Sequence, residues 1–383
     1  MSTDPSDAPG RRGQAATRRD AVAVNLALQG GGAHGAFTWG VLDRLLEDDT
    51  IDFGWISATS AGAVNAAALC IGLARGGRDD ARSTLASVWN AVVQTSVPDL
   101  ARINPWLAGS LATLSRSGTL ASVASMFSPY EFNPLGFDPL RKLLEEHIDV
   151  ALLRSRSGPE VLIAATDVAT GIARLFRRHE ISIEAILASA CLPTIHHAVE
   201  IEGRAYWDGG FSANPDLITI ATECEVGDTL IVQLSPLAKP ASPKTAREIA
   251  AHISHITFNR PYVAEIEAIV RLREAHALQR RRWRPWRRNT REAALPATRI
   301  AAHRFHLIDG GLVTSRLPDA TKAKPEQSVL DYLFRAGRTE ASKWLERHGP
   351  SIGKHDTAEL AARLAGLKSD SNAVAALVET DAA

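Results

Sequence analysis

The sequence contains few cysteines and no excess of charge of either sign. Cys70, Cys191 and Cys224 include no C-x-x-C pair and cannot all pair with one another, which favours a reducing compartment such as the cytoplasm. Lysine plus arginine and aspartate plus glutamate number 43 each in 383 residues. The chain as a whole therefore offers no electrostatic argument for binding nucleic acid or anionic lipid.

The chain also lacks an apolar stretch near its start that could form the core of a signal peptide. We therefore expect residues 1–20 to be a solvated tail and the protein not to be secreted by the ordinary route. Residues 55–74 carry no charge and are long enough to span a membrane, but they include Ser57, Ser60 and Asn65. These polar residues, set among many small ones, favour tight packing in a soluble core.

Strand-like and helix-like patterns alternate in the first part of the chain. Residues 21–28 form a short apolar run that ends at glycines, which is typical of a buried parallel strand. Residues 37–46 have apolar side chains at helical spacing, residues 53–58 resemble a second strand and residues 63–73 a second helix. This alternation predicts an α/β fold with a mainly parallel central sheet. Further strands are expected at residues 161–168, 172–176, 229–234 and 303–308, a hairpin at 199–207, and helices at 137–147, 183–190 and 327–345.

We expect residues 21–221 to form one α/β domain. An irregular insertion rich in serine, proline and glycine interrupts it at about residues 95–135. Residues 222–350 are predicted to be a mostly helical C-terminal extension that packs on this domain, and residues 351–383 a tail.

A glycine-rich loop, GGGAHG at residues 30–35, lies directly between the first predicted strand and its helix. Backbone N–H groups converge at such a helix N-terminus and can hold an anion. The match to the dinucleotide-binding pattern G-x-G-x-x-G is weak, because that fold expects an acidic residue at the end of the second strand. At that position the chain has the turn Ala58-Thr59-Ser60-Ala61-Gly62.

Ser60 is a candidate nucleophile. A serine on a sharp turn between a strand and a helix, with small residues two positions to either side, has the arrangement of a nucleophile elbow. The alternative is that Ser60 only caps the following helix. The glycine loop at the end of the neighbouring strand favours the nucleophile, because it would place an oxyanion hole on the same sheet edge.

A serine nucleophile needs a base. Asp208, directly before Gly209 and Gly210, is one candidate, although a carboxylate with an ordinary pKa of about 3.9 needs a desolvated site to act as a base. Alternatively, Asp208 only forms a turn. Asp167, which ends a predicted strand, is a second aspartate that could be taken for the catalytic acid, and for it too a turn-forming role is the alternative. The other candidate bases are the histidines, among them His34, His147, His179, His196 and His197.

Three separated motifs together resemble the patatin-like phospholipase family. They are the glycine loop GGGAHG, the serine turn ATSAG, and the run ASACLPTIHHAVEIEGRAYWDGG at residues 188–210, which is followed by Asn214-Pro215. The resemblance covers about residues 25–221 and implies a three-layer α/β fold. It also implies a Ser-Asp dyad, with Ser60 as nucleophile and Asp208 as its base, and His34 as a loop residue. The implied oxyanion hole consists of the backbone amides of Gly31, Gly32 and Ala61, and the remaining motif residues are Gly30, Gly35, Ala58, Gly62, Gly209 and Gly210.

Two further features refine the resemblance. The family usually has glycine where this chain has Ala58, and the added methyl group crowds the turn. Residues 128–148 and the segment GRTEASKWLERHG at 337–349 resemble a bacterial subgroup of patatin-like proteins with an extra C-terminal region of undefined role.

The resemblance implies a cytoplasmic serine acyl hydrolase of the lipase or phospholipase type, which cleaves lipid carboxylic esters in lipid catabolism or remodelling without a metal or other cofactor. Another acyl-ester activity on the same dyad is an alternative: thioesterase, acyltransferase or polyester depolymerase. A third possibility is a catalytically weak lipid-binding or regulatory protein, for which Ala58 is the sequence argument. The sequence leaves the oligomeric state open.

The segment from Arg280 to Arg291 contains seven arginines with Trp283 and Trp286. We interpret it as a flexible, solvated loop or as a peripheral contact to anionic lipid headgroups; nucleic acid is not expected as a partner. The histidine pairs of the chain have no H-E-x-x-H motif or cysteine cluster nearby, so no metal site is predicted.

Overall fold

A computed structural model describes residues 21–94, 129–133, 136, 138–155, 158–239, 242–282 and 296–369. The predicted tail at 1–20, most of the insertion at 95–135 and all but the first three residues of the segment from Arg280 to Arg291 lie outside this part of the chain. The same holds for residues 370–383 of the predicted C-terminal tail.

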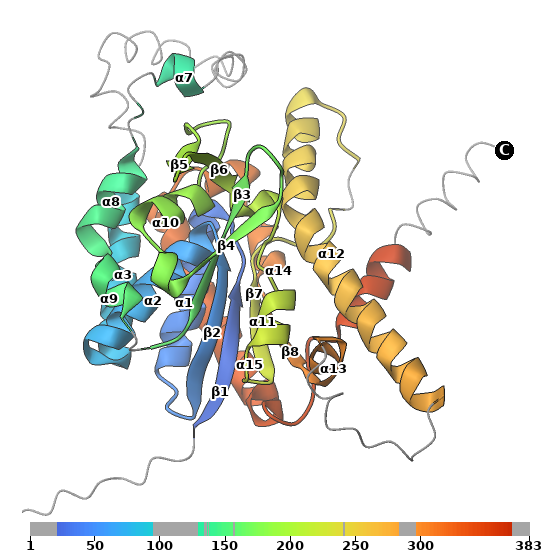
Figure 1. Ribbon diagram of the computed structural model, residues 1–383. Helices are drawn as coiled ribbons and strands as arrows, with labels where there is room; N and C mark the ends of the chain where they lie inside the picture. The colour runs from blue at the N-terminus through green and yellow to red at the C-terminus, as the bar shows by residue number, and fades with distance from the viewer. Residues whose placement is uncertain are drawn as a thin grey trace, which may run out of the picture.

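One sheet lies at the centre of the described structure, with the strand order β5-β6-β3-β2-β1-β7-β8 and with β4 paired to β3 (Figure 1). Neighbouring strands from β3 to β8 along this order run parallel, whereas β4, β5 and β6 are antiparallel to their partners. The predicted mainly parallel sheet is therefore confirmed. The strands are β1 (Val22–Leu28), β2 (Ile51–Thr59), β3 (Val161–Asp167), β4 (Ala173–Arg177), β5 (Val199–Ile201), β6 (Arg204–Asp208), β7 (Asp228–Gln233) and β8 (Arg304–Asp309).

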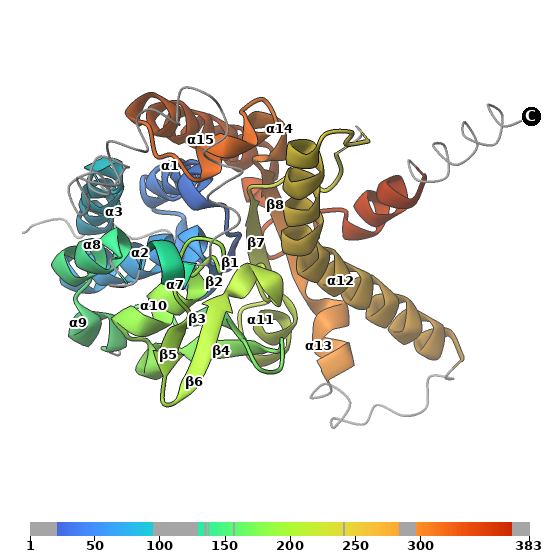
Figure 2. The ribbon, with the colours of Figure 1, turned by 90° about the horizontal axis from the view of Figure 1, so that it is seen from above.

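Helices cover both faces of the sheet, so the described fold has three layers (Figure 2). Successive side chains of a strand point to opposite faces: Leu26 and Leu28 join one hydrophobic core, and Ala27 between them joins the other. The first core contains residues of α1 (Gly35–Leu46), α2 (Ala61–Gly76), α3 (Arg78–Gln94), α8 (Pro139–His147), α9 (Val150–Arg154), α10 (Ile183–Ser189) and α15 (Gln327–His348). The second contains residues of α11 (Ile218–Glu223), α12 (Ala246–Arg282) and α13 (Pro296–Ala302). The short helices α7 (Pro129–Phe132) and α14 (Gly311–Thr314) are also present, and residues 360–369 are helical.

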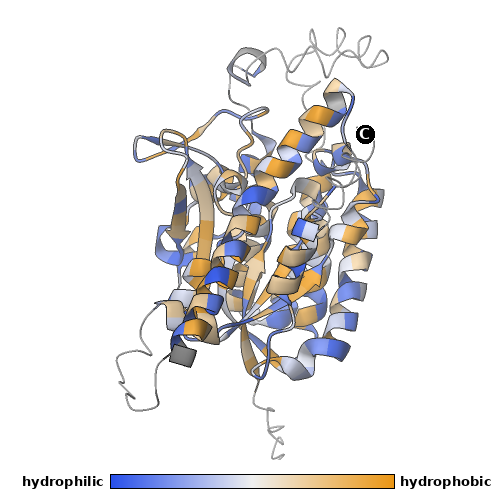
Figure 3. Ribbon diagram, turned by 90° about the vertical axis from the view of Figure 1, so that its right-hand side faces the viewer, coloured by the Kyte–Doolittle hydropathy of each residue, from blue (hydrophilic) through white to orange (hydrophobic). Residues whose placement is uncertain are grey.

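The long helix α12 forms the outer surface over the second core, and its turns alternate between hydrophobic and hydrophilic residues (Figure 3). Tyr262, Ile266 and Ile269 are buried against the sheet side, whereas Ile253 and Ile256, nearer its start, are exposed. No helix of the described residues is both long enough and apolar enough to cross a bilayer.

The residues beyond 221 are built into the same sheet and cores. Strand β7 pairs with β1 in parallel, and α15 packs against α1, where Arg338 forms ion pairs with Asp43 and Glu47. The predicted boundary of the C-terminal tail at residue 351 comes too early, because Leu360 and Leu364 are buried in the second core.

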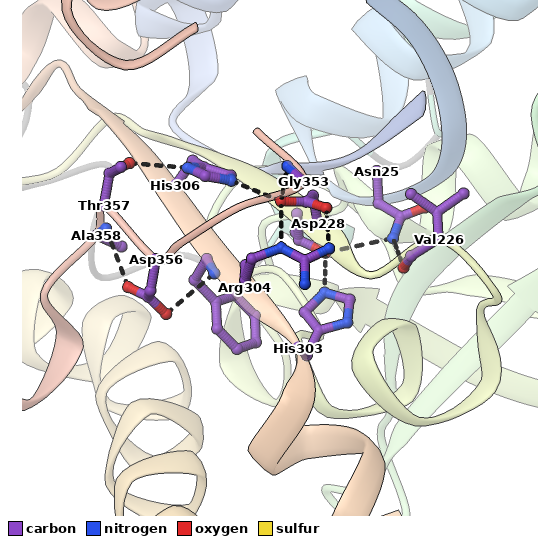
Figure 4. A network of polar contacts seen from close by, with 12 residues as sticks. Asn25, Val226, Asp228, His303, Arg304, His306, Gly353, Asp356, Thr357 and Ala358 are labelled. Carbon is purple, nitrogen blue, oxygen red and sulfur yellow. Dashed lines mark hydrogen bonds and ion pairs between the residues drawn. The ribbon is translucent and has the colours of Figure 1, made fainter. Parts of the chain in front are cut away.

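The buried carboxylate of Asp228, at the start of β7, connects residues 353–357 to the sheet through hydrogen bonds (Figure 4). Asp228 accepts hydrogen bonds from Arg304 Nε at 2.8 Å and from the N–H of Gly353 at 2.9 Å, and its Oδ1 lies 3.0 Å from His306 Nε2. His306 in turn contacts the hydroxyl of Thr357 at 2.8 Å. Burial alone would raise the pKa of Asp228, but the hydrogen bonds from His306, Arg304 and Gly353 hold it below its usual range. The carboxylate is therefore an anchor for residues 353–357.

We expect Asp228→Asn to lower the free energy of unfolding at pH 7 by about 3 to 5 kcal/mol, because it leaves the Arg304 guanidinium without its buried partner. Urea unfolding followed by circular dichroism measures the change. The control is Asp52→Asn, whose carboxylate is 57% exposed and pairs with Arg78; this surface pair should contribute no more than about 1 kcal/mol. Since the pKa of Asp228 is lowered in the folded state, the difference should shrink as pH falls below about 4. Equal losses for the two variants would contradict the anchoring role.

Candidate active site

The glycine loop, Ser60 and Asp208 meet at one edge of the sheet. The glycine loop follows β1 and Ser60 follows β2, so both lie where parallel strands end, at the top in Figure 1. Asp208 is the last residue of the antiparallel strand β6 and pairs with Ala165 of β3. The next residue, Gly209, has so little room that a Cβ there would overlap the carbonyl oxygen of Ala164 and lie 3.0 Å from the Thr59 side chain. The chain after Asp208 therefore passes across β3 to the end of β2.

Ser60 has the backbone geometry of a strained turn. Its φ of 56° and ψ of −123° are rare for any residue with a side chain. Helix α2 begins at the next residue and comes so close to β1 that a Cβ on Gly62 would overlap the carbonyl oxygen of Leu28. Ala58, in contrast, is fully buried within β2 and has no positive φ. The turn therefore accommodates the methyl group of Ala58, although the family usually has glycine there.

Ser60 is near the carboxyl group of Asp208, which is 1% exposed. Burial raises the pKa of Asp208 to about 7, and the hydrogen bond from the Gly210 N–H and the influence of the Ser60 side chain keep it from rising further. Near neutral pH the carboxyl group is therefore partly ionised and a much stronger base than an exposed aspartate.

Backbone hydrogen bonds fix the position of Asp208. Its N–H donates to the carbonyl oxygen of Cys191 at 2.8 Å, and its own carbonyl oxygen accepts from the Thr166 hydroxyl at 2.8 Å. One carboxylate oxygen accepts from the N–H of Gly210 at 2.8 Å. The side chain is thus held toward Ser60 with little rotational freedom.

The glycine loop lies against the serine turn. A Cβ on Gly30 would be 2.8 Å from the Cβ of Ser60, and the N–H of Gly30 donates to Asn214 Oδ1 at 2.8 Å. Within the described part of the chain, the N–H groups of Gly31, Gly32 and Ala61 have no hydrogen-bond acceptor. These three donors are therefore free to bind an oxyanion. Gly35 is the first residue of α1.

His34 and Asp167 are engaged elsewhere. His34 is 1% exposed, and its Nε2 lies 2.8 Å from the Thr321 hydroxyl. Burial, and then the charge of Lys322, lowers the pKa of His34 to about 4. Asp167 lies at a turn, where hydrogen bonds from Thr170 hold the pKa of its carboxyl below the usual range. Both side chains are therefore engaged by partners other than Ser60.

Three residues to which the sequence analysis assigned no role support the site. Ser189 Oγ accepts a hydrogen bond from the N–H of Ser60 at 2.8 Å, Asn214 holds the glycine loop, and Thr166 holds Asp208. Ser189 and Asn214 lie in or directly after the third motif, so the motif itself was a signal for them. No sequence pattern pointed to Thr166, because it is one of several small residues in a buried strand.

The histidine pairs do not assemble into a metal site. His252 and His255 have ring centroids 6.2 Å apart on α12, and the ring of His197 stacks on Tyr130 at 4.1 Å. Across the described residues, no three side chains of histidine, cysteine, aspartate or glutamate are grouped to hold a metal ion.

Comparisons with known proteins identify the family. The family model of patatin-like phospholipases matches residues 26–220, about half of the chain. No curated protein matches the sequence significantly. Among solved structures, the crystal structure of VipD from Legionella pneumophila is 14% identical over 85% of this chain and 67% of VipD, with a TM-score of 0.36. By the match to the family model, the chain belongs to the patatin-like phospholipase family.

Proposed function

We propose that the protein is a serine acyl hydrolase that cleaves lipid carboxylic esters through Ser60 and Asp208. Ser60 Oγ attacks the ester carbonyl carbon while the Asp208 carboxylate accepts the hydroxyl proton. The resulting oxyanion is bound by the amides of Gly31, Gly32 and Ala61. The alcohol leaves with the proton returned from Asp208, and water, activated by the same carboxylate, releases the acyl group from Ser60. Membership of the family supports hydrolysis of lipid esters in general.

The single observation that carries this proposal is the buried carboxyl group of Asp208, whose pKa burial raises to about 7 and which is near enough to Ser60 for that side chain to lower it. A general base is most effective when its pKa is near the working pH. An aspartate that only formed a turn would gain nothing from burial, which disfavours its charged form. A serine that only capped α2 would accept a hydrogen bond from an N–H of the first turn, and Ser60 makes no such bond.

A shallow groove beside Phe211, three residues after Asp208, offers apolar surface for the acyl part of a lipid ester. It is lined by Ile172, Ala173, Ile256 and Pro261, together with the polar residues Ser212, Thr257 and Arg260. We propose that the acyl chain of the substrate lies along this groove.

The location and the membrane contact of the protein remain proposals. The three free cysteines are buried, and we propose a cytoplasmic enzyme. The described start of the Arg-rich segment, Arg280 to Arg282, is the last turn of α12 and lies at the bottom of the molecule in Figure 1, away from the site at the top. A membrane contact made by residues 280–282 would therefore be distant from the site, and the entrance to the site would need its own lipid contact.

A fluorophosphonate probe tests the proposal against a lipid-binding protein without catalysis. We expect the folded protein to be labelled within minutes, and mass spectrometry of the labelled peptide to place the probe on Ser60. Ser189 and Ser212 are internal controls, because both lie near the site but neither contacts Asp208 through its side chain. Labelling of another serine, or none in protein whose circular dichroism shows it to be folded, would favour the binding protein.

A further inference from the structure

The first turns of α12 expose a row of isoleucines. Ile249, Ile253 and Ile256 are 43%, 59% and 54% exposed, and their spacing places them on one face of the helix. His255 and Tyr262, on the side that faces the sheet, are buried. A surface helix normally turns polar residues toward solvent. This half of α12 instead has an outward apolar face that the described part of the chain leaves open.

The row continues into the groove beside Phe211. Ile256 lines that groove together with Ile172, which is 68% exposed in the turn between β3 and β4. Contiguous apolar surface of this kind marks a contact site more often than an isolated exposed side chain does. We call these four exposed side chains the isoleucine patch: Ile172, Ile249, Ile253 and Ile256.

The patch offers no unpaired charge to a partner. Among the residues that line the groove, Arg260 alone is charged, and its guanidinium lies 3.2 Å from the carboxylate of Glu267. A strongly acidic or basic peptide would therefore find no complementary charge there. The chemistry of the patch suits an apolar partner.

The turn of α12 that follows the patch contacts the active site. A Cβ on Gly210 would overlap the ring of Phe258, and the N–H of Gly210 donates to the Asp208 carboxylate. The carbonyl oxygen of Phe258 accepts from Asn214 Nδ2 at 3.0 Å, and Asn214 Oδ1 accepts from the N–H of Gly30. Phe258 lies two residues after the last isoleucine of the patch, so the patch and the dyad are built on touching elements.

The patch and the active site also lie at the same end of the molecule. The start of α12 is at the top in Figure 1, where the ends of β1 and β2 carry the glycine loop and Ser60. The described end of α12, at Arg282, is at the bottom. A flat surface that rests on the patch therefore adjoins the active site, whereas one that rests on the other end of the helix does not.

We propose that the isoleucine patch docks the protein on a lipid surface, with Ile249 and Ile253 inserted among the lipid chains. The inference rests on the proposed function and identifies the surface through which the enzyme would reach its substrate. Isoleucine side chains gain free energy when they leave water for hydrocarbon. A protein partner on the patch would cover the groove beside Phe211, whereas a lipid surface would supply the acyl chain that lies in it.

Vesicles that cannot be hydrolysed test the docking apart from catalysis. The full chain is sedimented with vesicles of ether-linked dialkyl phosphatidylcholine, which contain no carboxylic ester. We expect the wild type to bind, and the double variant Ile249→Gln/Ile253→Gln to have a partition coefficient lower by about 10- to 100-fold, because two side chains no longer transfer to hydrocarbon. Glutamine has a helix propensity at least as high as that of isoleucine, so α12 should persist.

The matched control is Leu278→Gln, because Leu278 is 59% exposed on the same helix but near its other end. This variant should bind vesicles as the wild type does. Equal losses in the control and the double variant, or a wild type that does not bind these vesicles, would overturn the docking surface. Binding only to anionic vesicles, abolished by about 0.5 M NaCl, would assign the contact to charged groups and would overturn it too.

Two measurements test other occupants of the patch. If sedimentation velocity shows a dimeric wild type and a monomeric double variant, the patch is an interface between two copies of this chain. If the double variant unfolds more than about 5 °C below the wild type, another segment of this chain covers the patch, since exposed side chains contribute little to stability. Either result would overturn the docking on lipid.

Activity on two esters separates this inference from the proposed function. Ile249 and Ile253 do not line the groove, so the double variant should hydrolyse dissolved p-nitrophenyl butyrate within about 2-fold of the wild type. Its hydrolysis of a long-chain ester held in vesicles should fall with vesicle binding. If the wild type hydrolyses neither ester, the hydrolase proposal fails, and binding to the ether-lipid vesicles still decides the docking. Equal losses of the double variant on both esters would overturn the docking role.

Discussion

Replacing Ser60 by alanine should lower kcat for p-nitrophenyl butyrate by about 10⁵- to 10⁶-fold, the range seen when a serine hydrolase loses its nucleophile. The remaining oxyanion donors and the substrate groove are unchanged by this substitution, so a small residual rate above the uncatalysed reaction is expected. Absorbance of the released p-nitrophenol, followed over several hours, measures this residual rate. The N–H of residue 60 can still donate to Ser189, and the fold should persist.

The matched control is Ser57→Ala. Ser57 lies in β2, the strand that ends just before Ser60, is 1% exposed, and its hydroxyl has no hydrogen-bond partner among the described residues. Its removal should leave kcat within about 2-fold of the wild type. If Ser60→Ala retained more than about a tenth of the wild-type turnover, the nucleophile would have to be another group.

Asp208→Asn should lower kcat by about 10⁴-fold, because an amide cannot accept the serine proton. The wild-type kcat/KM should rise with pH about a midpoint near 7, the pKa of Asp208, because only the ionised carboxylate is a base. Below that midpoint the rate should fall about 10-fold per pH unit. The residual activity of the variant should lack this midpoint.

The same substitution should stabilise the folded protein above pH 7. The pKa of Asp208 is raised from an ordinary value of about 3.9 to about 7 in the folded state. The stability associated with its protonated form is therefore complete below about pH 4 and is lost as pH rises to about 7. Asparagine is neutral at every pH, so at pH 8 Asp208→Asn should be more stable by on the order of 4 kcal/mol. Thermal unfolding at pH 5 and pH 8 measures the difference.

Asp167→Asn is the control for the pH midpoint. Asp167 is a neighbouring acid at the end of β3, and its hydrogen bonds from Thr170 lower its pKa. Its replacement should leave the midpoint near pH 7 in place. If instead Asp167→Asn removed the midpoint and Asp208→Asn kept it, the base would be Asp167.

Local patterns predicted most elements of the sheet, because buried parallel strands are short apolar runs bounded by turns. Residues 21–28, 161–168 and 229–234 correspond within one residue to β1, β3 and β7. Helix α3 was not predicted, although Ala81, Leu85, Val88 and Trp89 are buried on one side of it. Charged and polar residues occupy much of the rest of the helix, so its average composition concealed the apolar face.

The candidate residues could be found from the sequence because each follows a strand with its own turn chemistry. The sequence could not show which residues of the C-terminal region contact the site. The contact of Lys322 with Gly32 joins residues far apart in the chain, and no local pattern connects them. The raised pKa of Asp208 likewise depends on burial by several elements, which a motif does not report.

The pairing of β7 with β1 has a consequence for any shortened form of this protein. The family match ends at residue 220, yet the strand that bears the glycine loop has its second neighbour at residues 229–232. A fragment that stopped at the end of the match would leave the backbone of β1 unpaired along one side and its apolar side chains open to water, and such an edge recruits other chains. The segment that identifies the family is therefore too short to be a folding unit, and a minimal version has to include the strand that closes its edge.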